Sequence, residues 1–445
     1  MNVGSYPLCL GVNCGEAIML NRVLRAAAVM KMLYGFTIGL YLYIYPLTFA
    51  TLFGSDDKGQ FLFGAVFVFD FIMEALLDAP LGAYADIKGY KSTLQGAFIF
   101  RGLYFLGLVF TVVLSGNAVF AVPLAFISMT LFAISYTLWS GANSAWLYDS
   151  LKQVGAENAY LKHFSKIQTG YYVCFIAGAV LSAYLYFEDR VRLAYGLGIV
   201  CSLAGAFFIR IYLPEPKIKE RKMSYKKQVI SVISDAWRYC LTTNDIYYLL
   251  QLGAFFALLF NTVNYLWPAY AKGRLGIVKL DWKWISVIIV MTLGSLVGNA
   301  YIGSRWKREH DNALIEWRHY LMSAFFFGFP ILLLSVIAIS GYNNIVLFLM
   351  IMAAARIAFG AKDAPYEALM NRLITRVGQT HTMSRPPGEI RATILSSASV
   401  FNAVLMFFFF VPTLMVGHGT VKGWALPALL LVIATIVTHR KGSRT

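Results

Sequence analysis

The 445-residue sequence predicts an all-helical integral membrane protein, with twelve transmembrane helices arranged as two six-helix repeats. Three observations predict this class: the composition, the recurrence of long apolar segments, and two internal matches at nearly one offset. Hydrophobic residues make up 59% of the chain and charged residues only 13%, whereas about a quarter of an ordinary soluble domain is charged. The composition therefore excludes a soluble enzyme and a disordered chain.

The remaining composition argues against several other classes. The net charge of +16 does not indicate nucleic-acid binding, because the basic residues lie in short loops between apolar segments. The five cysteines and six isolated histidines show no metal-ligand spacing, and the sequence has no phosphate-binding Gly-x-x-x-x-Gly-Lys loop. We expect no metal, no cofactor and no enzyme activity. The first 25 residues lack the apolar core of a signal peptide.

Apolar segments long enough to cross a bilayer recur along the whole chain. A helix crosses about 30 Å of hydrocarbon with about 20 residues. The predicted spans, in chain order, are 27–51, 60–86, 92–115, 118–148, 159–187, 191–213, 245–271, 282–304, 318–340, 343–371, 391–416 and 420–438. The long polar connector 214–244 divides them equally, which predicts an N-terminal bundle over 1–213 and a C-terminal bundle over 245–445.

The basic residues of the connecting segments predict the orientation. With the N-terminus inside, the inner segments hold 26 Lys and Arg residues, including Lys31 at the start of the first span, and the outer segments hold 8. Because cytoplasmic loops are enriched in Lys and Arg, both termini are expected in the cytoplasm. We expect a multi-pass protein of the cell membrane, either an inner or a plasma membrane.

The connector 214–244 has a helical pattern of its own. After a basic run from Lys217 to Lys227, apolar residues follow the i, i+3, i+4, i+7 spacing of one helical face from Val229 to Leu241. Basic residues flank this face, so the segment is expected to lie as a helix in the inner interface and to link the two halves.

Two sequence matches indicate an internal duplication. Tyr43-Ile-Tyr-Pro46 in the first span matches Tyr265-Leu-Trp-Pro268 in the seventh, at an offset of 222. Gly141-Ala-Asn-Ser-Ala145 in the fourth span matches Gly360-Ala-Lys-Asp-Ala364 in the tenth, at an offset of 219. Six spans is an even number, so both copies have the same orientation, as in parallel repeats. Two such bundles suit alternating access better than a pore.

The loop between the second and third spans carries a family signature. It reads Gly82-Ala-Tyr-Ala-Asp86-Ile-Lys88-Gly89-Tyr-Lys91 and is preceded by Asp78-Ala-Pro80. It resembles the loop signature of the major facilitator superfamily at the same place in the chain. Arg391-Ala-Thr393, at the start of the eleventh span, is similar to an opening found in drug-exporter-like members. The resemblance covers essentially the whole chain.

The chain departs from two signatures of proton-coupled members of this family. An Arg four residues before the glycine of the fourth span is replaced by Thr137, whereas Arg356 has that spacing before Gly360 in the tenth. The Gly-Pro pair that drug antiporters carry in the fifth span is absent. Drug–proton antiport therefore remains an alternative.

The resemblance implies a cytoplasmic gate between the two bundles. The Asp86 carboxylate is expected to meet the N-terminal end of the eleventh helix, whose free N–H groups favour an anion, and to hold the bundles closed there. The residues assigned to this gate are Gly82, Asp86, Lys88, Gly89, Lys91, Asp149, Asp363, Glu367 and Arg391.

Charged residues inside the spans are costly and mark a transport pathway. In the second span, Asp70, Glu74 and Asp78 are spaced i, i+4, i+8 and lie on one helical face. Three neighbouring carboxylates repel, so at least one is expected to carry a proton near neutral pH. Arg101 lies at a similar depth and could form a static pair with Asp78 or Glu74. We assign these four residues to coupling with a proton or monovalent cation.

Polar residues on the helices that line the cavity in this family are candidates for substrate binding. They are Tyr34, Tyr41, Asn143, Asn261, Asn264 and Arg356, of which Arg356 is the candidate for an anionic group. Packing alone would also explain a tyrosine stripe in the first span.

The predicted function is a monomeric secondary transporter in the lipid bilayer that moves a small organic solute by alternating access. Efflux of amphipathic compounds by proton antiport is an alternative within this class. A transporter-like sensor and an integral-membrane enzyme are alternatives from other classes. The histidines have no acidic partner at catalytic spacing, which argues against the enzyme.

Overall fold

The computed structural model describes residues 14–45, 47–49, 57–215, 225–274, 282–305, 313–339, 344–377, 391–406, 408 and 422–442. All regular elements in these ranges are helices. In chain order they are α1 (Cys14–Leu42), α3 (Asp57–Lys88), α4 (Tyr90–Val113), α5 (Ala118–Gln153), η1 (Glu157–Ala159), α6 (Tyr160–Phe187), α7 (Val191–Tyr212), α8 (Tyr225–Thr242), α9 (Asn244–Arg274), α10 (Trp282–Arg305), α11 (Ala313–Ile339), α12 (Ile345–Val377), α13 (Arg391–Leu405) and α15 (Lys422–Gly442).

The predicted all-helical membrane class is confirmed. Within the described ranges, nine helices are long and apolar enough to cross a bilayer. Helix α3 covers the second predicted span, but its middle carries the three carboxylates. Helix α13 covers the eleventh predicted span as far as Leu405, beyond which most residues of that span lie outside the described ranges, and α15 covers the twelfth from Lys422. The count of twelve crossings and the cytoplasmic placement of the termini stay predictions.

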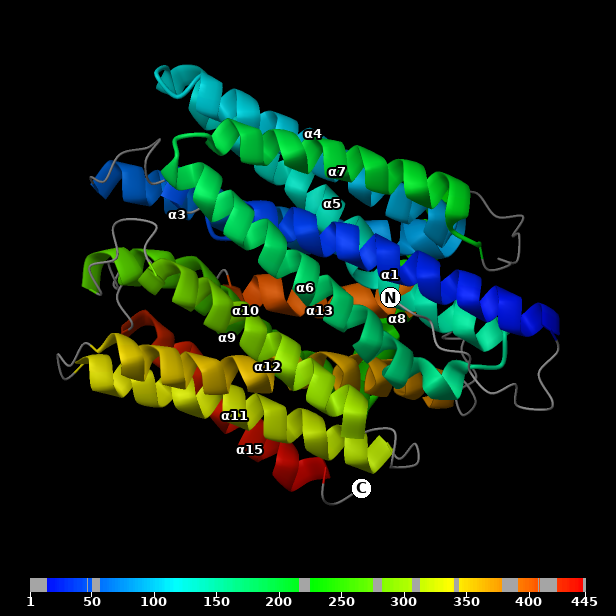
Figure 1. The fold of residues 1–445 in the computed structure, drawn as a ribbon. Helices are drawn as coiled ribbons and strands as arrows, with labels where there is room; N and C mark the ends of the chain where they lie inside the picture. The colour runs from blue at the N-terminus through cyan, green and yellow to red at the C-terminus, as the bar shows by residue number, and fades with distance from the viewer. Residues whose placement is uncertain are drawn as a thin grey trace.

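The helices before and after α8 pack mainly within two groups (Figure 1). In the first, α1 packs against α6, and α4 packs against both α5 and α7. In the second, α12 packs against α10 and α11, and α11 packs against α15. We call the helices before α8 the first half and those after it the second half, and the two predicted bundles over 1–213 and 245–445 stay a prediction.

Helices α1 and α6 meet along a glycine seam formed by Gly35, Gly39 and Gly178. A Cβ atom on Gly35 would lie 2.5 Å from the Tyr171 carbonyl oxygen, and one on Gly39 would lie 2.3 Å from that of Phe175. From the opposite helix, a Cβ atom on Gly178 would lie 2.4 Å from the Phe36 carbonyl oxygen. The two backbones therefore touch, because no side chain stands between them.

Helix contacts in two places join the halves. In the first, α13 packs against α3 and α5, and in the second, α6 packs against α10. In the second contact, the Asn299 amide donates to the Ser165 carbonyl oxygen (2.7 Å), and the Ser165 hydroxyl donates to the Asn299 carbonyl oxygen (2.8 Å). This reciprocal pair satisfies buried backbone groups of both helices where they cross.

The predicted helix in the connector is present as α8. Val232, Ala236 and Cys240 of the predicted apolar face are buried, together with Tyr239, whereas Leu241 is exposed. The helix packs against α9 and α13 of the second half and against α3 of the first. It therefore lies against both halves, and its apolar face is covered by protein.

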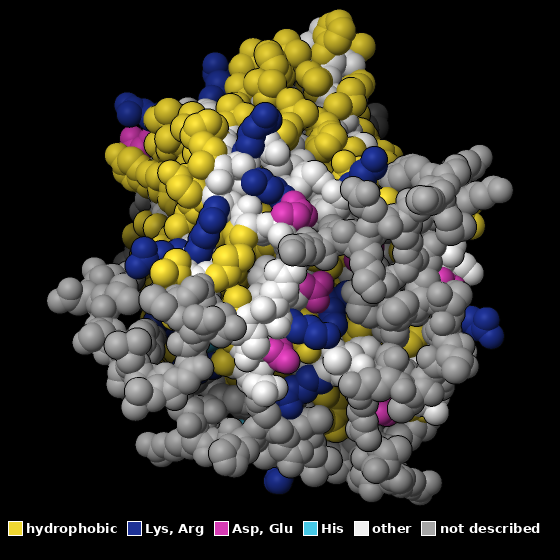
Figure 2. Space-filling model, turned by 90° about the vertical axis from the view of Figure 1, so that its right-hand side faces the viewer, with side chains coloured by type: hydrophobic (Ala, Val, Ile, Leu, Met, Phe, Trp, Pro, Cys, Tyr) yellow, Lys and Arg dark blue, Asp and Glu magenta, His cyan; other side chains and the backbone are white. Residues whose placement is uncertain are grey.

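Basic and acidic side chains gather at the end of the molecule where α1 begins. Figure 2 shows them in the middle of that face, with hydrophobic side chains at its upper edge. The chain connections there include the turn between α3 and α4, which carries the loop signature. We call this the signature end.

Candidate functional site

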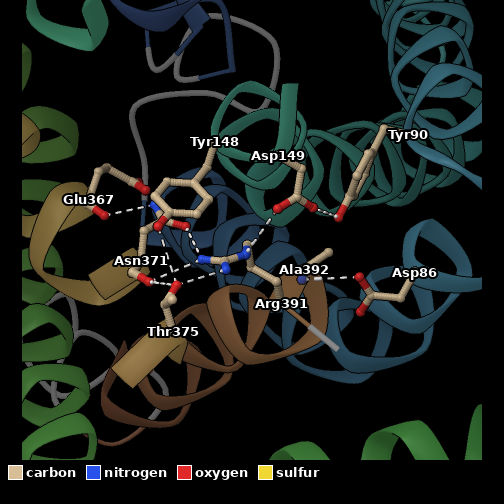
Figure 3. Close-up of polar contacts among 9 residues, drawn as sticks. All are labelled: Asp86, Tyr90, Tyr148, Asp149, Glu367, Asn371, Thr375, Arg391 and Ala392. Carbon is tan, nitrogen blue, oxygen red and sulfur yellow. Dashed lines mark hydrogen bonds and ion pairs between the residues drawn. The ribbon is translucent and has the colours of Figure 1, made fainter. Parts of the chain in front are cut away.

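At the signature end, Asp86 of α3 lies at the first turn of α13 (Figure 3). Its carboxylate accepts hydrogen bonds from the backbone N–H groups of Ala392 (3.1 Å) and Thr393 (3.0 Å), and from the Thr393 hydroxyl (2.7 Å). These N–H groups have no partner within their own helix, and the helix dipole favours an anion there. The contact implied by the family resemblance is thus present, and its role as a gate stays a prediction.

Arg391 begins α13 and ties it to both halves. Its Nε lies 3.5 Å from the Asp149 carboxylate of α5, which also accepts a hydrogen bond from the Tyr90 hydroxyl (2.8 Å). On the second half, Arg391 donates to the Asn371 side chain (2.8 Å) and to the Thr375 hydroxyl (3.1 Å). We call Asp86, Arg391 and these four partners the α13 network. Its contacts join α13 to helices of both halves at the signature end.

The other residues assigned to the gate lie around this network. Gly89 has φ of 103°, in the left-handed region that favours glycine, and makes the turn from α3 to α4. The Lys91 backbone N–H donates to Glu215 (3.2 Å), so the turn is held to the start of the connector. Lys88 is exposed, and Glu367 lies one turn before Asn371 on α12 (Figure 3).

Gly82 and Gly141 let α3 and α5 approach α13 closely. A Cβ atom on Gly82 would lie 2.9 Å from the Ser396 hydroxyl, and one on Gly141 would lie 2.4 Å from the Ala392 carbonyl oxygen. The Ala392 carbonyl oxygen belongs to the backbone, so it cannot rotate away from the added Cβ atom as a side chain can. The close packing of α5 against α13 therefore depends on a residue without a side chain at position 141.

We expect Gly141→Ala to open the signature end, because overpacking of this kind costs about 1–3 kcal/mol. The measurement is the distance between spin labels at Lys152→Cys in the first half and Ser304→Cys in the second, in a background without native cysteines. Gly196→Ala is the matched control, since a Cβ atom there would meet nothing within 4 Å. An unchanged distance distribution in Gly141→Ala would contradict the prediction.

The three carboxylates of α3 face the protein interior. Asp70 and Asp78 have no exposed surface and Glu74 only 5%, whereas Leu76 on the opposite side of the helix is 64% exposed. The predicted face is therefore the buried one. Both Asp70 oxygens lack a hydrogen-bond partner within the described part of the chain, and the Ser140 hydroxyl donates to Asp78 (3.2 Å).

Arg101 does not form the static pair considered from the sequence. Its guanidinium donates to the Tyr34 hydroxyl (2.7 Å) and the Ser135 hydroxyl (3.0 Å), and no described carboxylate lies within ion-pairing distance of it. It still interacts electrostatically with Asp70 and Glu74. Its position along the sequence does not determine its direction around the helix axis.

Four of the residues predicted to bind substrate lie apart from one another. Tyr34 stacks on Trp139 (ring centroids 3.8 Å apart), and Tyr41 packs edge-on against rings that include Tyr104. Both tyrosines are thus packed inside the first half. Asn143 is buried in α5 and Asn261 is half-buried in α9. Their part in binding stays a prediction.

Arg356 and Asn264 come together in the second half. The Arg356 guanidinium donates to the Asn264 side chain, and lies 4.9 Å from the centre of the Phe260 ring and 5.6 Å from that of Phe359. Across the interface it interacts electrostatically with Tyr43 and Tyr172 of the first half. Of the predicted binding residues, these two form a direct pair.

A second group of charges between the halves was missed from the sequence. Lys31 is buried, whereas it was expected from the sequence among the basic residues at the inner end of the first span. Its ammonium donates to Gln168 (2.8 Å) and faces Glu367 and Asp363 of α12 electrostatically. Asp363 also accepts from the Tyr172 hydroxyl (2.7 Å). The signal was available, since Lys31 falls inside the predicted span.

Among known protein families, curated proteins and solved structures, only solved structures match the chain. No protein-family model and no curated protein matches the chain. Among solved structures, the human organic anion transporter MFSD10 (TETRAN) has a TM-score of 0.65 at 15% identity, covering 93% of this chain and 99% of that one. The major facilitator superfamily proton:xylose symporter XylE has a TM-score of 0.66 at 14% identity, covering 96% of each chain. This chain has the major facilitator superfamily fold.

A third structure, a bacterial homologue of the iron transporter ferroportin in an outward-facing state, has a TM-score of 0.62 at 14% identity and covers 94% of this chain and 98% of that one. The three similar proteins differ widely in what their names say they transport. These similarities show the fold, while the transporter class and the expectation that the chain is not an enzyme stay predictions. The fold leaves the substrate open, because function depends on the residues of the site.

Proposed function

We propose that this chain is a secondary transporter that moves a small organic solute across a cell membrane by alternating access. Movement of the solute is driven by a proton or monovalent cation gradient through Asp70, Glu74 and Asp78. The fold supports the transporter class. The coupling proposal depends on the residues of α3.

The observation that carries the proposal is the row of buried carboxylates on α3. A buried carboxylate without a partner is costly in its charged form, and binding a proton or a cation relieves that cost. Asp70 is in this condition, with no exposed surface and no hydrogen bond to either oxygen among the described residues. Arg101 is the nearby positive charge whose position would decide when the carboxylates release their ion.

The contacts between the halves support alternating access. At the signature end they are polar and form the α13 network. At the opposite end, aromatic rings of the two halves meet: Tyr43 lies 5.3 Å from Trp267, and Phe187 lies 5.6 Å from Trp284, between ring centroids. Each end thus has a separate set of contacts that can form and break.

The test is uptake into liposomes containing the purified full-length chain. With a pH gradient of one unit, about 1.4 kcal/mol is available for each coupled proton. We expect at least one solute of a metabolite and amphipathic-compound screen to accumulate about tenfold, and a protonophore to abolish this accumulation. A sodium gradient is tested in parallel. If no solute accumulates under either gradient, the proposal is wrong.

A further inference from the structure

Four cations are buried in the described residues, and three of them have an acidic counterpart. They are Lys31, Arg101, Arg356 and Arg391. Lys31 faces Glu367 and Asp363, Arg101 faces Asp70 and Glu74, and Arg391 pairs with Asp149. Arg356 is the exception: within the described part of the chain, its electrostatic neighbours are the tyrosines Tyr43 and Tyr172.

The surroundings of Arg356 hold it in place without neutralising it. Arg356 is 3% exposed, and its Nε has no hydrogen-bond partner among the described residues. Asn264 accepts from one nitrogen, and the flanking Phe260 and Phe359 rings add cation–π attraction. None of these groups carries a negative charge. A buried guanidinium without a counter-ion is strongly unfavourable, so a site that keeps one needs an anion for part of its cycle.

A second donor without a partner lies on the same side of the interface. The Trp267 indole Nε1–H is buried without a hydrogen bond to any described residue. Its ring packs against Tyr43, the residue that also interacts with Arg356. Two residues with an unpaired buried donor, Arg356 (Nε) and Trp267 (Nε1), therefore both interact with Tyr43. Buried donors of this kind are normally paired, and the group they lack is an acceptor.

We infer that the transported solute is an organic anion whose carboxylate or phosphate group is bound by Arg356. This inference rests on the proposed function. The planar guanidinium matches such groups through two parallel hydrogen bonds. The rings of Tyr43, Trp267 and Phe260 would contact an apolar part of the same molecule. Because Tyr43 and Tyr172 belong to the first half and Arg356 to the second, the anion would contact both halves.

The test is thermal unfolding of the full-length protein in detergent with matched pairs of probes. Benzoate, octanoate and phenyl phosphate are each compared with a neutral partner: benzamide, octanamide and phenol. We expect at least one anion, and not its partner, to raise the melting temperature, because a ligand that binds only the folded state stabilises it. Arg356→Gln should abolish this shift, and Arg356→Lys should keep part of it. Arg210→Gln, which removes an exposed arginine of α7, should leave it unchanged.

The same variants give a readout that does not need a ligand. Without added anion, Arg356→Gln should unfold at the same or a higher temperature than the wild type, because it removes an uncompensated buried charge. A lower temperature would indicate a structural partner and contradict the inference. So would the absence of any anion-specific shift in the wild type, or a shift of equal size in Arg356→Gln.

The two proposals can fail separately. If an anion binds through Arg356 but no solute accumulates under a gradient, the proposed function is wrong and the anion site remains. If a neutral solute accumulates equally in the wild type and Arg356→Gln, the anion site is wrong and the transporter function remains.

Discussion

Replacing Asp70 by Asn together with Glu74 by Gln is expected to abolish uphill transport while leaving exchange intact. The amides keep the size of the side chains but can no longer bind or release a proton at neutral pH. In the wild type, a gradient of one pH unit supports about tenfold accumulation for each coupled proton. In the double variant, the solute should only reach equal concentrations on both sides.

The measurement combines gradient-driven uptake with solute counterflow in the same liposomes. Retained counterflow shows that the double variant is folded and still binds the solute. Glu188→Gln, which removes an exposed carboxylate between α6 and α7, serves as the control and should accumulate solute like the wild type. Full accumulation by the double variant would show that coupling does not pass through α3.

The second large effect is expected for Asp86→Asn. The carboxylate accepts three hydrogen bonds at the first turn of α13, two of them from backbone N–H groups. Removing its charge should weaken the contact by about 3 kcal/mol, which shifts the ratio of closed to open signature ends roughly 100-fold. The variant should populate the form in which this end is open.

Spin labels at Lys152→Cys and Ser304→Cys report this change as a longer distance between the halves. Asp86→Glu, which keeps the charge, should recover part of the closed population. A distance distribution in Asp86→Asn that matches the wild type would mean that α13 is held by Arg391 and its partners alone.

Much of the fold could be predicted from local patterns in the sequence. Apolar length placed a helix over each predicted span in the described residues, and the i, i+4, i+8 spacing placed Asp70, Glu74 and Asp78 on one buried face. The contact of Asp86 with α13 was implied by the resemblance to the major facilitator superfamily, whose loop signature places a carboxylate at the end of α3. These predictions need only short stretches of chain.

The remaining parts of the site depend on packing between distant helices. Tyr172 and Asp363 are 191 positions apart, and no local pattern joins them. Counting along the helix placed Arg101 near the carboxylates of α3, but its guanidinium turns toward Tyr34 and Ser135 of neighbouring helices. Lys31 was placed at a helix end by its charge, and only the packing of α1 against α6 shows it beside Gln168.

The glycine seam between α1 and α6 has a mechanical consequence. With their backbones in contact at Gly35, Gly39 and Gly178, the two helices cannot slide past each other and behave as one stiff lever. At 1.5 Å per residue, α1 alone is roughly 40 Å long. In the proposed alternating-access cycle, a tilt of this lever that separates the halves at Ser165 would press them together at Phe187. We therefore expect the two ends of the proposed pathway not to be open at the same time.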